Sequence, residues 1–309
     1  DFRKFKGLPH RMMLLVGANG VGKTRLLANL AVALSGATQV DRSSEQALAR
    51  RQDSGIVRPL PSFYGVTAVS FNPFDEFEIP SPAEDARYQY TYLGLRNSDG
   101  SIRDGTSLGT SIDSVLESMQ EPQRVRAGLA IDRLFPQLMG KLPDYSALSA
   151  GQKVAINILI HLISNLKERT LVLLDEPEAH LHPSLVLALL AEICKLLEEN
   201  DCFAIVASHS PLVAQQIPSR YVRVLRNAEI GRSAARPEFE CLGASISQLS
   251  VELFDSAEHR RDYTHVIDEL LSRNDYSLDA LEEIFKGMLS QNATMYAASM
   301  AARAPRVRR

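Results

Sequence analysis

The sequence predicts an α/β fold in which helices cover a mostly parallel sheet. Two observations predict it. Short apolar runs bounded by glycine or proline alternate with longer segments of helical periodicity, and the stretch 75–147 has a different texture, rich in proline, serine, aspartate and glycine. We therefore expect a sheet lobe in two parts, over 1–74 and 148–244, with a helical lobe inserted at 75–147. A helical extension is expected over 245–309.

The expected elements follow from their local patterns. Short apolar runs indicate buried strands, and longer amphipathic or fully apolar segments indicate helices. Strands are expected at 12–16, 66–71, 88–95, 171–174 and 203–207. Helices are expected at 23–34, 111–119, 124–138, 150–167 and 181–199, with another beginning at Pro211.

Composition narrows the class of protein. The 309 residues are 45% hydrophobic and 23% charged, with a net charge of −3, so no global positive field indicates nucleic-acid binding by this chain alone. The sequence has no apolar run long enough for a membrane helix, and its three cysteines form no CxxC pair. We expect a cytoplasmic protein without a membrane partner.

A glycine-rich segment, Gly17–Thr24, lies between the first expected strand and the first expected helix. It reads Gly-Ala-Asn-Gly-Val-Gly-Lys-Thr and matches the P-loop pattern G-x-x-x-x-G-K-[ST]. In such a loop the backbone N–H groups wrap a phosphate, Lys23 reaches the β- and γ-phosphates, and the Thr24 hydroxyl ligates Mg²⁺. The alternative is a glycine-rich connector, which the flanking strand and helix disfavour. The nucleotide contacts expected here are Asn19, Gly20, Val21, Gly22, Lys23, Thr24 and Arg25.

Two adjacent carboxylates, Asp175 and Glu176, end the apolar run 171–174. A desolvated carboxylate is costly without a partner, and a Mg²⁺ ion near Thr24 would give Asp175 one. Glu176 would then polarise a water for attack on the γ-phosphate. The alternative is an ordinary strand-end turn with solvated acids.

His209 follows the apolar run 203–207 in the same way. Ligands of parallel sheets bind beyond the carboxyl ends of the strands, so Gly17, Asp175 and His209 can converge on one nucleotide. A merely structural histidine is the alternative. Its position relative to the other motifs favours a catalytic role, shared with Glu176 and Lys23.

A second phosphate receptor is expected at 148–153, which reads Leu-Ser-Ala-Gly-Gln-Lys and begins an apolar helix. Ser149 is an expected N-cap, while Gly151 in the first turn costs helix stability unless something must approach the backbone closely. An exposed helix N-terminus with a serine hydroxyl can bind phosphate. We expect Ser149, Gly151 and Gln152 to serve a nucleotide held by another copy of the chain.

In order and spacing these motifs resemble those of ATP-binding-cassette (ABC) ATPases, over nearly all of residues 1–255. The resemblance implies that two heads sandwich two ATP molecules with Mg²⁺, each ATP bound by the P-loop of one head and the signature helix of the other. It also implies roles for individual residues. Glu176 would be the general base, His209 the γ-phosphate sensor, and Ser149 with Gly151 the contact from the second head.

Other segments resemble a narrower group. The stretches 175–183 (Asp-Glu-Pro-Glu-Ala-His-Leu-His-Pro) and 207–211 (Ala-Ser-His-Ser-Pro) are similar to the OLD-like and RecF-like branch. The stretches 90–96, 149–153 and 242–254 are similar to the Septu-type antiphage ATPases (PtuA), which are encoded beside an HNH-type nuclease and sometimes with a retron. This implies a homodimer or higher oligomer with a nuclease partner. The family's glutamine loop has no clear glutamine here, and Asn72 is the best substitute.

The hypothesis is a Mg²⁺-dependent ATPase of a bacterial antiphage defence system. After His209 the chain has neither the D-x-D acids of a Toprim nuclease nor a Cys/His-rich HNH motif, so nucleic acid would be reached through the partner. The alternatives are a RecF- or OLD-like DNA-repair ATPase, a nucleotide-stabilised scaffold with little turnover, and the energy-coupling subunit of a transporter. For the H-x-H pair His180 and His182 we expect packing and dimer contact rather than metal binding.

Overall fold

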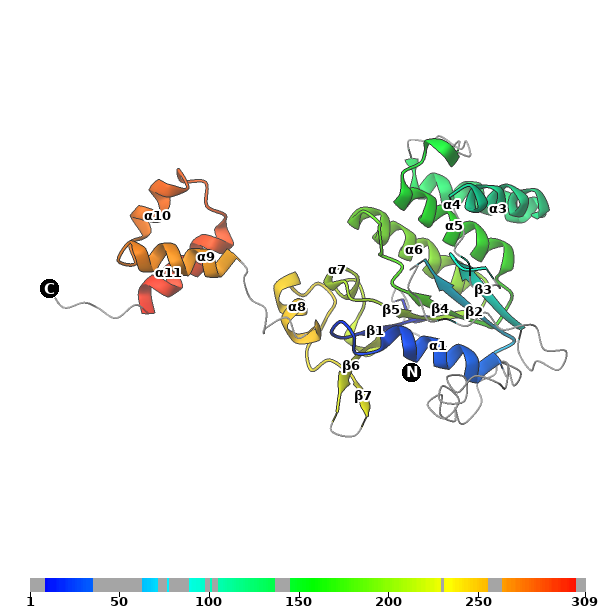
Figure 1. Cartoon of the computed structure of the whole chain (residues 1–309), viewed down its shortest axis with the longest axis horizontal. Helices are drawn as coiled ribbons and strands as arrows, with labels where there is room; N and C mark the ends of the chain where they lie inside the picture. Colours follow the sequence, from blue (N-terminus) through cyan, green and yellow to red (C-terminus); the bar gives the residue numbers. More distant parts are fainter. Residues whose placement is uncertain are drawn as a thin grey trace. The chain divides into compact units, whose positions relative to one another are not determined.

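The computed structural model describes residues 9–35, 63–71, 77, 89–97, 101, 105–136, 145–228, 231–254 and 263–303. The chain divides into two compact units, Asp1–Phe254 and Asp255–Arg309 (Figure 1). Asn72, the expected glutamine-loop substitute, lies outside the described residues.

A sheet of seven described strands forms the centre of the first unit, in the order β3-β2-β4-β5-β1-β6-β7. The strands are β1 Met12–Val16, β2 Gly65–Ser70, β3 Gln89–Gly94, β4 Thr170–Asp175, β5 Phe203–Ala207, β6 Val222–Asn227 and β7 Arg232–Ala235. All neighbours run parallel except β6 and β7, which form an antiparallel hairpin. The predicted α/β fold with a mostly parallel sheet is confirmed.

The register of the sheet sets the position of the site. Strand β5 lies between β1 and β4, and Ala207 at its end is opposite both Leu15 and Asp175. Because these three strands are parallel, the segments that follow them leave the sheet at one edge. Gly17, Glu176 and His209 therefore emerge from three adjacent strands.

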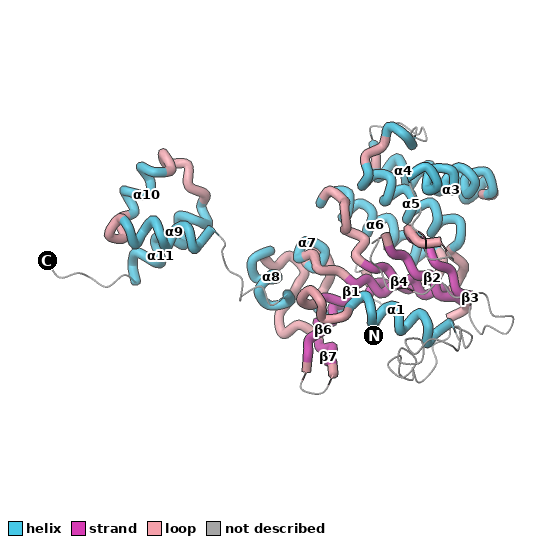
Figure 2. Tube along the Cα trace, viewed as in Figure 1, coloured by secondary structure: helices cyan, strands magenta, loops and turns pink. Residues whose placement is uncertain are grey.

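Helices cover both faces of the sheet, as Figures 1 and 2 show. Leu171 and Leu173 on one face of β4 share a core with α1 (Lys23–Ser35). Val172 and Leu174 on the other face share the main core with the two helices α5 (Ala150–Asn165) and α6 (Pro183–Glu199). The apolar side chains of β4 thus alternate between two cores, which explains why all four residues 171–174 are apolar.

The inserted segment differs in part from the expectation. The helices α3 (Gly105–Ser118) and α4 (Glu121–Leu134) pack on α5, and α4 also on α6. Strand β3, however, lies inside the expected helical lobe 75–147 yet pairs with β2 as the edge strand of the main sheet. Its Tyr90 and Tyr92 pack against the core on the α1 face.

The expected extension after residue 245 also divides differently. Helix α8 (Ile246–Phe254) belongs to the first unit, where Leu249 and Leu253 join the main core beside α7 (Pro211–Ala214). The second unit contains α9 (Tyr263–Arg273), α10 (Leu278–Ile284) and α11 (Gln291–Arg303), which share a small core of their own. None of the helices that the structure describes is both long and apolar enough to cross a membrane.

Candidate functional site

The P-loop connects β1 to α1 and encloses the ammonium group of Lys23. That side chain is buried, and its Nζ donates hydrogen bonds to the carbonyl oxygens of Gly17 (2.9 Å) and Ala18 (3.1 Å). Gly20 and Gly22 have φ angles of 75° and 90°, which glycine adopts at little cost. Burial lowers the pKa of Lys23, although the nearby acids oppose this. The loop therefore presents a desolvated cation and backbone groups to an anion.

Thr24 and Asp175 meet at the end of β4. The Thr24 hydroxyl donates to Oδ1 of Asp175 at 3.1 Å, and Asp175 is 2% exposed. A hydroxyl and a carboxylate are hard oxygen ligands of the kind Mg²⁺ prefers, usually together with phosphate oxygens and water. The donor set present here therefore fits Mg²⁺ bound beside a phosphate.

Glu176 and His209 form a pair across the ends of β4 and β5. Oε1 of Glu176 lies 3.1 Å from Nδ1 of His209. The hydrogen bond from His209 lowers the pKa of the Glu176 carboxyl, although burial alone would raise it. The same hydrogen bond raises the pKa of His209 against the effect of burial. The pairing thus favours the carboxylate form of Glu176 and the imidazolium form of His209.

Glu178 is a site residue to which the sequence analysis gave no role. Its Oε1 accepts hydrogen bonds from the Ser208 hydroxyl (2.5 Å) and the His209 backbone N–H (3.0 Å), and its side chain is 9% exposed. It thereby fixes the segment after β4 to the end of β5, which holds Glu176 and His209 side by side. The signal in the sequence is the second glutamate of Asp-Glu-Pro-Glu, two residues after Glu176.

Ser149 begins α5 with a reciprocal capping box. Its hydroxyl accepts from the Gln152 backbone N–H (3.3 Å), and the Gln152 side chain accepts from the Ser149 backbone N–H (2.9 Å). Gly151 has a packing reason within its own chain, because a Cβ there would lie 2.6 Å from the carbonyl oxygen of His180. The close approach expected at this glycine is therefore made, at least in part, by the segment before α6.

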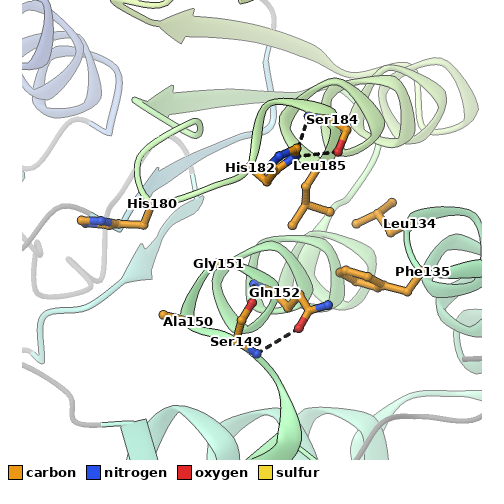
Figure 3. Close-up of a pocket in the computed structure, with 10 residues that line it drawn as sticks. All are labelled: Leu134, Phe135, Ser149, Ala150, Gly151, Gln152, His180, His182, Ser184 and Leu185. Atoms are coloured by element: carbon orange, nitrogen blue, oxygen red, sulfur yellow. Dashed lines mark hydrogen bonds between the residues drawn. The ribbon is translucent and has the colours of Figure 1, made fainter. Parts of the chain in front are cut away.

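A pocket of about 630 Å³ opens at this helix terminus (Figure 3). His182 turns towards Ser184, with Nδ1 2.8 Å from its hydroxyl, and it accepts from the Ser184 backbone N–H as the N-cap of α6. The described residues that line the pocket are Leu134, Phe135, Ser149, Ala150, Gly151, Gln152, His180, His182, Ser184 and Leu185.

The expected site residues thus form two groups within one chain. The first group gathers Lys23, Thr24, Asp175, Glu176 and His209 around the P-loop. The second group, at the start of α5, borders a pocket whose described lining includes no member of the first.

Comparison with known proteins gives one family match and several relatives. Residues 103–214 match a family described as an AAA domain of the AbiEii toxin type, from type IV toxin–antitoxin systems. Protein ea59 of Escherichia phage lambda is 26% identical over 323 residues, which cover 89% of this chain and 59% of that protein. This chain therefore spans less than two thirds of that relative.

Two solved structures are similar at low identity. A metal-chelate type ABC transporter in an inward-facing conformation is 17% identical, with a TM-score of 0.38 over 73% of this chain and 71% of that chain. CbiO1 from Clostridium perfringens, part of the ABC transporter complex cbiONQ, is 17% identical, with a TM-score of 0.37 over 89% and 87%. At these TM-scores the likeness carries no argument, and the α/β fold with its P-loop rests on this chain's own strand order and on the segment Gly17–Thr24.

Proposed function

We propose that this chain binds and hydrolyses ATP with Mg²⁺, and that it does so as a subunit of a bacterial antiphage defence system that controls a separately encoded HNH-type nuclease. The observation that carries the ATPase proposal is the gathering of Lys23, the Thr24–Asp175 contact and the Glu176–His209 pair at adjacent strand ends. The defence role is supported by the resemblance to Septu-type ATPases and by the toxin–antitoxin description of the matching family.

Each group has a part in hydrolysis. Lys23 would exchange the carbonyls of Gly17 and Ala18 for β- and γ-phosphate oxygens. Thr24 and Asp175 would hold Mg²⁺, which would neutralise charge on the phosphates when bound. Glu176 accepts a proton from the water whose oxygen bonds to the γ-phosphorus. The bond from that phosphorus to the bridging oxygen breaks, and ADP leaves with the electron pair.

His209 supplies positive charge in the same step. Its Nδ1 proton points at Glu176, so its other ring nitrogen remains for a γ-phosphate oxygen. An imidazolium there stabilises charge on the transferred group, and the hydrogen bond to Glu176 fixes the orientation of the ring.

The second receptor, at Ser149, is proposed to act on ATP bound to another copy of the chain. Its hydroxyl accepts from the Gln152 N–H and can donate its own proton to a phosphate oxygen. The described lining of the Ser149 pocket includes no residue of the P-loop group, which supports a site completed by a second protomer.

Glu176→Gln tests the hydrolytic role. Removing the base should lower turnover by about 10²- to 10⁴-fold while ATP still binds, measured by phosphate release and by equilibrium binding. Glu168→Gln, at an exposed position before β4, is the matched control. Full turnover in the Glu176 variant would contradict the assignment.

Mixing two inactive variants tests the shared site. Lys23→Ala disables the P-loop group, and Ser149→Asp keeps an N-cap but places a negative charge where phosphate should bind. An equimolar mixture should recover about a quarter of normal turnover, because half of the dimers are mixed and each has one intact site of two. Ser277→Asp, which alters the N-cap of α10, is the control. A mixture as inactive as its components would refute sharing.

The defence role has its own test. The activity of the proposed HNH-type nuclease partner should differ between ATP, ADP and a non-hydrolysable analogue when the complex is assembled. Equal effects of ATP and the analogue would instead support a nucleotide-stabilised scaffold. Salt-dependent DNA binding by the chain alone would favour the repair-type alternative.

A further inference from the structure

Arg232 lies directly against the P-loop, although it is distant from it in sequence. A Cβ on Gly22 would be 2.6 Å from both Cζ and Nη1 of Arg232 and 2.8 Å from Nη2. The guanidinium therefore occupies the space beside Gly22 that any other residue at this position would fill. Glycines in a P-loop allow the backbone to approach a phosphate closely, so this guanidinium is next to the expected phosphate position.

The position of Arg232 is fixed by the β6–β7 hairpin. Arg232 is the first residue of β7 and lies opposite Asn227 of β6, which in turn pairs with the P-loop strand β1. The hairpin also touches the start of the loop, where the Leu225 carbonyl oxygen lies 2.4 Å from the position of a Cβ on Gly17. Strand pairing, rather than a long flexible loop, thus carries the side chain to the P-loop.

The charges around Arg232 favour an anionic ligand. It lines a pocket of about 630 Å³ between α1 and the hairpin, and the described residues of that lining include no acid. Among the described residues, no carboxylate forms an ion pair with Arg232, whereas Lys23 lies near Glu176 and Asp175. The guanidinium of an arginine is a planar fork of N–H donors that suits phosphate oxygens.

We propose that Arg232 is a phosphate ligand of the bound nucleotide, supplied by the same chain through the β6–β7 hairpin. The proposal rests on the ATP binding proposed above. It adds to that site Arg232, which lies far in sequence from the P-loop motif. The ligand class is a polyphosphate: the guanidinium bonds oxygens of the phosphate chain on the Gly22 side of the loop.

Arg232→Ala tests the proposal by equilibrium binding of two probes, ATP and inorganic tripolyphosphate. Losing a charge-assisted contact should weaken both by about 10- to 100-fold, and Arg232→Lys should recover part of the loss. Arg236→Ala removes the same charge just after β7, outside the pocket lining, and should change binding less than about 2-fold. Because Arg232 is exposed, thermal unfolding should be unchanged.

The possible outcomes separate this proposal from the one on which it rests. If Lys23→Ala abolishes ATP binding while Arg232→Ala binds both probes like the unmodified chain, ATP binding stands and the Arg232 proposal is overturned. Tighter binding by Arg232→Ala would also overturn it, because the guanidinium would then block the site. Loss of ATP binding with unchanged tripolyphosphate binding would assign Arg232 to the base instead. If the unmodified chain binds neither probe, both proposals fail.

Discussion

Gly151→Ala should destabilise the first unit, although alanine is the better helix former. The new Cβ would lie 2.6 Å from the carbonyl oxygen of His180, and the next atoms, of Leu181, are 3.5 Å away. That oxygen belongs to the backbone, and His180 already has a φ of 66° in the left-handed region, so the segment has little freedom to yield.

The magnitude follows from two opposing effects. Overpacking of this kind costs about 1–3 kcal/mol, while replacing glycine by alanine within a helix gains up to about 1 kcal/mol. The clash should outweigh the gain in helix stability, with a net loss of up to about 2 kcal/mol in the free energy of unfolding.

Gly128→Ala in α4 is the matched control. A Cβ on Gly128 meets no described atom within 4 Å, so this variant should gain about 0.5–1 kcal/mol. Urea denaturation gives the two free energies, and hydrogen exchange of the first turn of α5 shows whether the loss is local. If Gly151→Ala were stabilised as much as Gly128→Ala, the contact with His180 would not be the constraint, and ligand approach would have to explain the glycine.

Two further predictions concern charge. ATP turnover should fall at acidic pH, where Glu176 is protonated below its lowered pKa, and at alkaline pH, where His209 is deprotonated above its raised pKa. Glu176→Gln should lower the pKa of His209, measured by NMR titration, because it removes the carboxylate that raises it. A pKa of His209 that does not fall would contradict the pairing. Arg133→Ala removes a two-point contact to buried Glu192 (2.8 and 2.6 Å) and leaves Lys195 as its one charged partner among the described residues, so the free energy of unfolding at neutral pH should fall by about 1–3 kcal/mol. Burial raises the pKa of Glu192, but Arg133 and Lys195 hold it below its usual value. The difference in unfolding free energy between the unmodified chain and Arg133→Ala should therefore shrink as acid protonates Glu192. A difference that does not change with pH would refute this role of the ion pair.

Local patterns predicted much of the fold because they are set by neighbours in sequence. The apolar runs of β1, β4 and β5 and the glycine pattern of the P-loop each lie within a few residues. The rule that ligands bind at the carboxyl ends of parallel strands then placed Asp175 and His209 together, and in the structure β5 lies between β1 and β4.

What the sequence missed depends on contacts between distant segments. The pairing of β3 with β2 cannot be inferred from the residues of β3 alone, so the sequence predicts this strand within the helical lobe. Glu178 acquires its role only when β4 and β5 are known to be adjacent. Arg232 reaches the P-loop only because β6 pairs with β1, and no local pattern indicates that.

The segment between β4 and α6 shows why the two groups of site residues cannot be treated as independent. At its start Glu176 bonds His209, and beyond its middle the His180 carbonyl rests on Gly151. Glu178, between them, is fixed to Ser208. Two of these residues, Glu176 and His180, have φ angles of 46° and 66°, so the shape of the segment is held by its contacts rather than by backbone preference. If Gly151→Ala displaces the carbonyl of His180, the movement either ends before Glu178 or reaches Glu176. A changed pKa of His209 in Gly151→Ala would show that it reaches Glu176, and an unchanged pKa would show that it ends before Glu178.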